Sequence, residues 1–159
     1  MDKCSASPIP IKKGDKFSLK QCPKNDLERR QMKDVPYTSV VGSLMYAQTC
    51  TRPGISFAVG MLNRYKSNPE MIHWKATKKV PRYLQGMKDY KLMYRKYDHL
   101  EVVGYLDSDF VGCVDTRKST FDYVYLLAGG AISRKSAKQS IIVASNMEAE
   151  FVACFEATI

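Results

Sequence analysis

Hydrophobic residues recur at helical spacing between residues 36 and 86. In segment 36–50 they fall at positions i, i+4, i+7 and i+8, and the period resumes after Pro53 in segment 51–65. Proline is tolerated in a first helical turn, because the N–H groups there have no intrahelical acceptor. Segment 70–85 repeats the pattern and ends at Gly86, a common terminator. The spacing predicts three helices whose buried faces are Tyr37, Val41, Leu44 and Met45; Ile55, Ala58, Val59, Leu62 and Tyr65; and Ile72, Ala76, Val80, Tyr83 and Leu84.

Pro81 lies inside the third of these predicted helices. A proline in a helix interior removes the hydrogen bond to the carbonyl four residues earlier, here that of Thr77, and crowds that group. The cost is about 3 kcal/mol unless the helix kinks. The sequence therefore contains a local conflict at this point.

The period becomes alternating after residue 88. Segments 90–97, 100–107, 121–130, 131–136 and 140–145 have the pattern of strands, with Phe121, Tyr123, Tyr125 and Leu127 on one face and a turn at Gly129–Gly130. Segment 146–157 is helical again, and we expect Met147, Phe151, Cys154 and Phe155 to pack on the sheet. The predicted fold class is α+β: a helical N-terminal unit, then a three-stranded antiparallel sheet with one helix packed on it.

Residues 1–35 show neither period and are interrupted by Pro8, Pro10 and Pro23, so we expect an irregular basic arm. Residues 1–99 carry 20 Lys and Arg against 8 Asp and Glu, a net charge of +12. Residues 100–159 carry 5 against 8, a net charge of −3. A basic first part favours a polyanionic partner, nucleic acid before membrane, and the acidic second part is where we expect a cation-dependent site.

The cysteines and the apolar runs narrow the class of protein further. Five cysteines are an odd number and show no CxxC spacing, which argues against a zinc cluster and a secreted disulfide framework. They favour a reducing compartment. No apolar run approaches the roughly 18 residues that a membrane span needs, and the N-terminus lacks a signal-peptide core. We therefore expect a soluble intracellular protein.

Four cations share one side of the predicted helix 70–85. Lys75, Lys78, Lys79 and Arg82 follow the spacing i, i+3, i+4, i+7. Such a stripe can lie against a phosphate backbone, where each cation releases counterions and the affinity depends on salt. It can equally be a solvated helix face, and the pattern alone leaves both interpretations open.

Carboxylates stand at the ends of two expected elements. Asp107 continues the alternation of a strand, and Asp109 begins the turn that follows. Ser145 and Glu148 have the spacing of a capping box, whereas Glu150 has no such structural role and borders the expected packed face. Two-metal hydrolysis of a phosphodiester needs several converging carboxylates, and Mg²⁺ prefers oxygen ligands. The residues alone leave open whether these acids are solvated or hold a metal.

Five segments, in this order, resemble the polyprotein of copia-type LTR retrotransposons, most familiar from plants. They are TRPGISFAVGMLNRY, HWKATKKVPRYLQG, GYLDSDFVG, DTRKSTFDYVYLLAGGAISRKSAKQS and ASNMEAEFVACFEA. The resemblance implies that residues 36–95 are a thumb-like or connection-like segment at the end of reverse transcriptase. Residues 100–159 would be the N-terminal half of an RNase H-like domain, with the antiparallel hairpins and first helix of a truncated RNase H-like fold.

The resemblance also implies roles for individual residues. Asp107 matches the family's first metal-binding aspartate and Glu150 its glutamate, with Asp109 and Glu148 as alternatives. The cofactor would be Mg²⁺, and the partners an RNA–DNA hybrid and the remainder of the Pol polyprotein. The location would be a cytoplasmic virus-like particle with a nuclear phase. The family's other catalytic aspartates would lie before Met1 or beyond Ile159, so we expect no polymerase activity and no RNA cleavage from this chain.

Five residues depart from the pattern of that family: Gly54, Pro81, Leu106, Asp122 and Arg134, where an acid, an aliphatic residue, a small hydroxyl residue, glycine and tryptophan are usual. They suggest a decayed genomic copy. Three hypotheses follow: an inactive polyprotein fragment, a non-catalytic nucleic-acid-binding module, and a nuclease completed by another chain.

Overall fold

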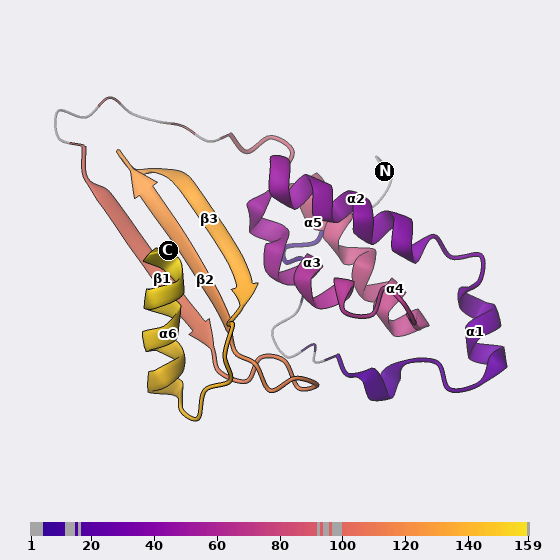
Figure 1. Cartoon of the computed structure of the whole chain (residues 1–159). Helices are drawn as coiled ribbons and strands as arrows, with labels where there is room; N and C mark the ends of the chain where they lie inside the picture. Colours follow the sequence, from indigo (N-terminus) through magenta and orange to yellow (C-terminus); the bar gives the residue numbers. More distant parts are fainter. Residues whose placement is uncertain are drawn as a thin grey trace. The chain divides into compact units, whose positions relative to one another are not determined.

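A computed structural model describes residues 5–11, 15, 17–91, 93, 96 and 100–158. The chain divides into two units, one up to Tyr90 and one from Lys91 onward (Figure 1). The first is helical and the second combines a sheet with a helix, so the predicted α+β class is confirmed. Each unit is described separately below.

The first unit consists of short helices in sequence order. They are η1 (Leu19–Gln21), α1 (Asp26–Met32), α2 (Tyr37–Cys50), η2 (Pro53–Ile55), α3 (Ser56–Asn63), α4 (Met71–Thr77) and α5 (Lys79–Gly86). Their core contains nearly all of the apolar residues expected from the spacing, including the fully buried Val41, Leu62 and Val80. Ile72 is the exception, since its side chain is 40% exposed.

The segment expected to be an irregular arm differs from that prediction. It contains α1, and Ile11, Phe17 and Met32 are buried in the core of the unit. With seven residues, α1 is too short to show a helical period. The charges at its ends favour a helix, because acids in the first turn and Arg29 and Arg30 in the last turn interact favourably with the helix dipole.

The predicted helix over residues 70–85 is two helices. It breaks at Lys78, where α4 ends and α5 begins. Pro81 is thereby the third residue of α5, within the first turn, where a backbone N–H has no intrahelical acceptor. The break resolves the conflict seen in the sequence, because the proline no longer interrupts a continuous helix.

A fully buried histidine organises the start of α4. The His73 ring stacks on Tyr65 with centroids 4.2 Å apart, and lies 5.5 Å from the Phe17 ring. His73 Nδ1 accepts a hydrogen bond from the Glu70 N–H at 3.0 Å, while Glu70 Oε2 accepts one from the Ile72 N–H at 2.9 Å. Burial lowers the pKa of His73, although Glu70 opposes this shift. The neutral imidazole therefore caps the helix and fills the core.

The second unit is an antiparallel sheet covered by one helix. Strands β1 (Val102–Asp109), β2 (Thr120–Leu127) and β3 (Gly130–Lys138) pair in the order β1–β2–β3, and α6 (Asn146–Thr158) contacts β1 and β2 (Figure 1). The turn between β2 and β3 is Ala128–Gly129, both with positive φ, rather than the expected Gly129–Gly130. Residues 140–145, expected as a strand, have no regular structure. Half of the strand expected at 90–97 falls outside the described residues.

The expected packing face of the C-terminal helix was wrong. Met147, Phe151 and Phe155 are 83%, 73% and 61% exposed, and Cys154 is exposed as well. The buried residues of α6 are instead Ala149, Val152 and Ala153. Small side chains let the helix backbone approach the strands closely, so the helix turns its small residues inward and its large ones to solvent.

We predict that Pro81→Ala changes the free energy of unfolding by less than about 1 kcal/mol, because a first-turn proline costs no hydrogen bond. Urea denaturation measures this, with Gln85→Pro in the same helix as the control, for which a loss of about 3 kcal/mol is expected. A stabilisation of about 3 kcal/mol by Pro81→Ala would mean that the proline strains a continuous helix.

We also predict that stability falls as the pH drops below 6.5, the ordinary histidine pKa. Below that value the unfolded chain binds a proton at residue 73, while the buried imidazole of the folded state does not, so protons favour unfolding by at most about 1.4 kcal/mol per pH unit. Denaturation curves between pH 5 and about 7.5 measure the effect. His99→Gln, which removes the other histidine, should leave it intact, and its disappearance in that variant would refute the assignment.

Candidate functional site

Three carboxylates share one face of the sheet. Asp107 in β1 is paired with Asp122 in β2, and Asp122 is paired with Ser136 in β3. Directly paired residues point to the same side of a sheet, so the two carboxylates and the Ser136 hydroxyl share one face. Asp109 lies two residues along β1 and therefore faces the same way. Asp107 and Asp109 are exposed, and Asp122 is half-buried. The sequence shows that Asp107 and Asp109 are near one another. That Asp122 joins them follows only from the register of β1 and β2.

Asp122 is the perturbed member of this group. Burial raises its pKa, a hydrogen bond from Ser136 opposes the shift, and the negative charges of Asp107 and Asp109 add to it. Arg134 lowers the pKa but only as a weaker influence. Among the described residues, the ion pairs are Arg29–Asp26 and Lys79–Asp15, so Arg134 does not form one with Asp122.

Asp109 ends its strand, as expected, and is committed to the turn. Its backbone carbonyl accepts a hydrogen bond from the Gly112 N–H at 3.1 Å, and its carboxylate lies so close to Gly112 that a Cβ there would collide with it. Val111, between them, has φ of 53°, and its N–H donates to Ser119 Oγ at 3.2 Å. The local role of Asp109 is therefore to shape this turn.

The N-terminus of α6 shows which of its acids is structural. The Glu148 N–H donates to Ser145 Oγ at 3.2 Å, which confirms Ser145 as the cap. Glu148 Oε2 accepts from the Ala144 N–H at 2.7 Å, one residue before the cap and not at the cap itself as expected. Glu150 takes no part in this arrangement and is half-buried.

The two candidate catalytic acids are not brought together. Tyr125 lies three positions after Asp122 in β2, so the two side chains are on opposite faces of the sheet. The Tyr125 hydroxyl donates to the Ala157 carbonyl of α6 at 3.0 Å. The helix therefore covers the face of Tyr125, and Asp107 lies on the opposite face from the helix that carries Glu150. In the part of the chain that is described, no three His, Cys, Asp or Glu residues are grouped to hold a metal ion. The described acids, Asp107 and Glu150 among them, are therefore not arranged as a three-ligand metal site.

The predicted basic stripe is split between α4 and α5. Lys75, Lys78 and Arg82 are exposed. The ammonium of Lys78 lies 5.7 Å from the centre of the Trp74 ring, a cation–π contact that leaves its charge at the surface. These three side chains remain available to an anion.

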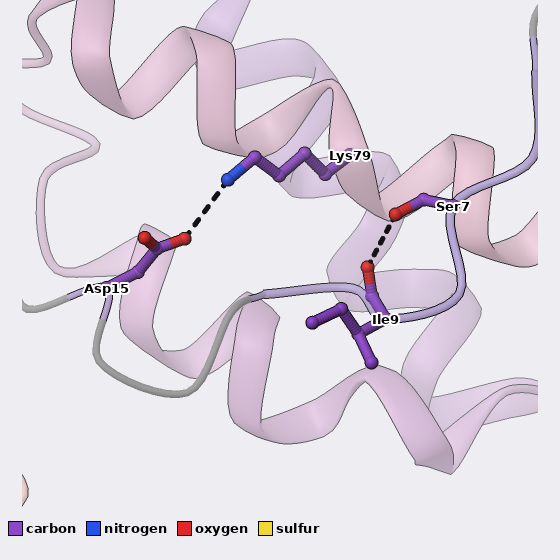
Figure 2. Close-up of polar contacts among 4 residues, drawn as sticks. All are labelled: Ser7, Ile9, Asp15 and Lys79. Carbon is purple, nitrogen blue, oxygen red and sulfur yellow. Dashed lines mark hydrogen bonds and ion pairs between the residues drawn. The ribbon is translucent and has the colours of Figure 1, made fainter.

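Lys79, the fourth member, is engaged within the protein. Its ammonium nitrogen is 3.1 Å from Asp15 Oδ2, and both side chains are about one-third exposed (Figure 2). The pair joins α5 to the N-terminal segment, whose Ser7 hydroxyl donates to the Ile9 carbonyl at 2.8 Å. The sequence could not reveal this pairing, because 64 positions separate the partners.

Known proteins resemble this chain over most of its length. It is 42% identical over 154 residues to the retrovirus-related Pol polyprotein from transposon TNT 1-94 of Nicotiana tabacum, which covers 96% of this chain and 12% of that polyprotein. It is 40% identical over 115 residues to the Pol polyprotein from transposon RE2 of Arabidopsis thaliana, covering 72% and 8%. The chain belongs to the family of retrovirus-related Pol polyproteins of copia-type plant transposons.

A shorter relative matches along nearly its whole length. Secreted RxLR effector protein 161 of Plasmopara viticola is 43% identical over 127 residues, which cover 80% of this chain and 89% of that protein. No family model and no solved structure matches the chain. None of the helices in the described residues is long and apolar enough to cross a membrane.

We predict that Asp122→Asn stabilises the second unit at pH 7. The raised pKa means that the folded state carries an unfavourable carboxylate at neutral pH, which the amide removes. The advantage should shrink as the pH falls through the pKa of Asp122 in the folded state, because the wild-type carboxyl then becomes neutral. Thermal denaturation at several pH values measures this. Glu101→Gln, at an exposed acid just before β1, is the control; an equal gain there would show a general charge effect.

Proposed function

We propose that this chain is the part of a Pol polyprotein where the end of reverse transcriptase meets the beginning of an RNase H-like domain. In this proposal the helical unit is thumb-like and grips an RNA–DNA hybrid, and the second unit contributes the first strands and helix of the RNase H-like fold. The membership of the family and the order of a helical unit before an antiparallel sheet and helix support it. The location would be a cytoplasmic virus-like particle with a nuclear phase.

The observation that carries the binding role is the exposure of Lys75, Lys78 and Arg82 near the break between α4 and α5. Phosphate groups spaced along a nucleic-acid strand are the natural partners of cations spaced along a surface. The helical unit has few carboxylates to neutralise these charges, since residues 1–90 carry 17 Lys and Arg against 7 Asp and Glu, a net charge of +10.

We further propose that the chain binds a hybrid without cleaving it. Cleavage assisted by two metal ions needs carboxylates that converge on one point. Asp107 lies on the face of the sheet opposite the helix that carries Glu150, and Glu148 and Asp109 are engaged in a helix cap and a turn. The placement of these carboxylates therefore favours binding by the exposed cations without hydrolysis by the acids.

The test is a labelled RNA–DNA hybrid incubated with the purified chain. We expect fluorescence anisotropy to show binding that weakens with salt, and gel electrophoresis to show no cleavage in Mg²⁺ or Mn²⁺. Replacing Lys75 and Lys78 by alanine should lower the slope of log affinity against log salt by about 2, because each phosphate contact contributes about 0.9. Lys20→Ala, at an exposed lysine of η1, is the matched control.

Two results would contradict this proposal in different ways. If the salt slope of the Lys75 and Lys78 variant were unchanged, the hybrid would bind to another surface of the protein. Metal-dependent cleavage that disappears in Asp107→Asn would show that this chain, alone or with another copy, completes a nuclease site.

A further inference from the structure

The helical unit contains a basic pocket that none of the predicted site residues lines. Its volume is about 560 Å³, and it lies between α1, the start of α2 and the loop that precedes α4. Pockets of about 300–1,000 Å³ are of the size that holds small-molecule ligands. Four of its lining residues are cations from two separate segments: Arg29, Arg30, Lys33 and Lys66.

These cations are poorly neutralised. Asp26 is the one acid in the lining, and its carboxylate lies 3.7 Å from the Arg29 guanidinium in an exposed pair. Among the described residues, no carboxylate lies within ion-pair distance of Arg30, Lys33 or Lys66. Cations that converge without counter-charges repel one another, and an anionic ligand would relieve that repulsion.

The start of α2 adds to the positive potential. The helix has 14 residues, and its cap residue, Pro36, offers no side-chain acceptor to the first turn. Thr38, in that turn, lines the pocket and donates its hydroxyl to the Lys66 carbonyl at 3.3 Å. The positive end of the helix dipole therefore faces the same space as the four cations.

Five apolar residues form another part of the wall: Pro23, Met32, Val35, Tyr37 and Pro69. Ser67 and Asn68 are the remaining polar residues of the lining. The Tyr37 hydroxyl is already used, because it donates to the Leu62 carbonyl at 2.8 Å, and burial raises the pKa of Tyr37 to about 12. Tyr37 is only 1% exposed, so it lies beneath the pocket surface, and the apolar wall open to a ligand comes from the half-buried Val35 and Pro69.

We propose that this pocket binds a nucleoside phosphate, with the phosphate among Arg30, Lys33 and Lys66 and the sugar or base against the apolar wall. Guanidinium and ammonium groups recognise phosphate oxygens, and an apolar wall recognises the less polar remainder of a nucleotide. The ligand is a free nucleotide or one unit of a polynucleotide strand. The pocket shares no residue with the exposed cations of α4 and α5, so this inference goes beyond the proposed hybrid-binding function.

Calorimetric titration of the full chain with adenosine 5′-monophosphate, adenosine, inorganic phosphate and a ten-nucleotide single strand tests the proposal. We expect the monophosphate to bind at least tenfold more tightly than adenosine or inorganic phosphate, because each of these lacks one half of the recognition. The strand distinguishes the sources: binding tighter than that of the monophosphate assigns the pocket to a polynucleotide, and weaker binding to a free nucleotide.

Charge reversal locates the binding. Arg30→Glu combined with Lys33→Glu should weaken monophosphate binding at least tenfold, whereas Lys20→Glu should change it less than twofold. Replacing Lys75 and Lys78 by alanine should also leave it unchanged, which separates this pocket from the surface proposed for the hybrid. An equal loss in all variants would overturn the proposal.

Amide chemical shifts of the wild-type protein provide a second measurement that needs no variant. Thr38, Ser67 and Asn68 line the pocket, and their signals should shift as the monophosphate is added. Absence of binding, shifts confined to other residues, or tighter binding of an oligoglutamate peptide than of the monophosphate would each overturn the assignment.

Discussion

The helical unit depends on a buried stack of rings contributed by three separate segments of the sequence. Phe17 comes from the N-terminal segment, Tyr65 follows α3, and His73 belongs to α4. The stack requires a neutral imidazole, because His73 Nδ1 accepts a backbone hydrogen bond. The loop from Lys66 to Pro69 follows Tyr65 in the sequence and leads to the helix of His73, and it forms one wall of the basic pocket. The core contact therefore also sets the position of surface charges.

The second unit is built with an internal conflict. Its sheet has an aromatic face covered by a helix and an opposite face on which three carboxylates gather. Burial raises the pKa of Asp122, and the negative charges of Asp107 and Asp109 raise it further. The repulsion disfavours the folded unit at neutral pH. Because the helix covers the other face, Asp107 is also on the side of the sheet away from the helix that carries Glu150. The two faces of the sheet therefore differ in both chemistry and cover.

Much of the fold could be predicted from the sequence, because regular spacing reports which residues are buried together. The face of α2 is an example, since Val41 and Leu44 are buried on one side of the helix and Ser39 and Ser43 are exposed on the other. The face of α6 could not be predicted in this way, because apolar residues surround the helix: Ala149 and Val152 lie on one side, Met147 and Phe151 on another. Size, not hydrophobicity, decides which side packs.

The candidate site was less accessible to prediction for a different reason. A break at Lys78 and a pairing of Lys79 with Asp15 divide a stripe that looked continuous. The proximity of Asp122 to Asp107 follows from strand register, and the convergence of Lys66 with Arg30 from the packing of a loop against a helix. These are relations between segments, whereas periodicity describes one segment at a time.

The outward row of Met147, Phe151 and Phe155 has a practical consequence for biophysical work on this chain. An anionic dye whose fluorescence increases on apolar surfaces should bind to the intact, fully structured protein. Such dyes are widely used to diagnose loosened, molten states. Here a bright signal would report the native surface of α6, and near-ultraviolet circular dichroism would be needed to tell the two conditions apart.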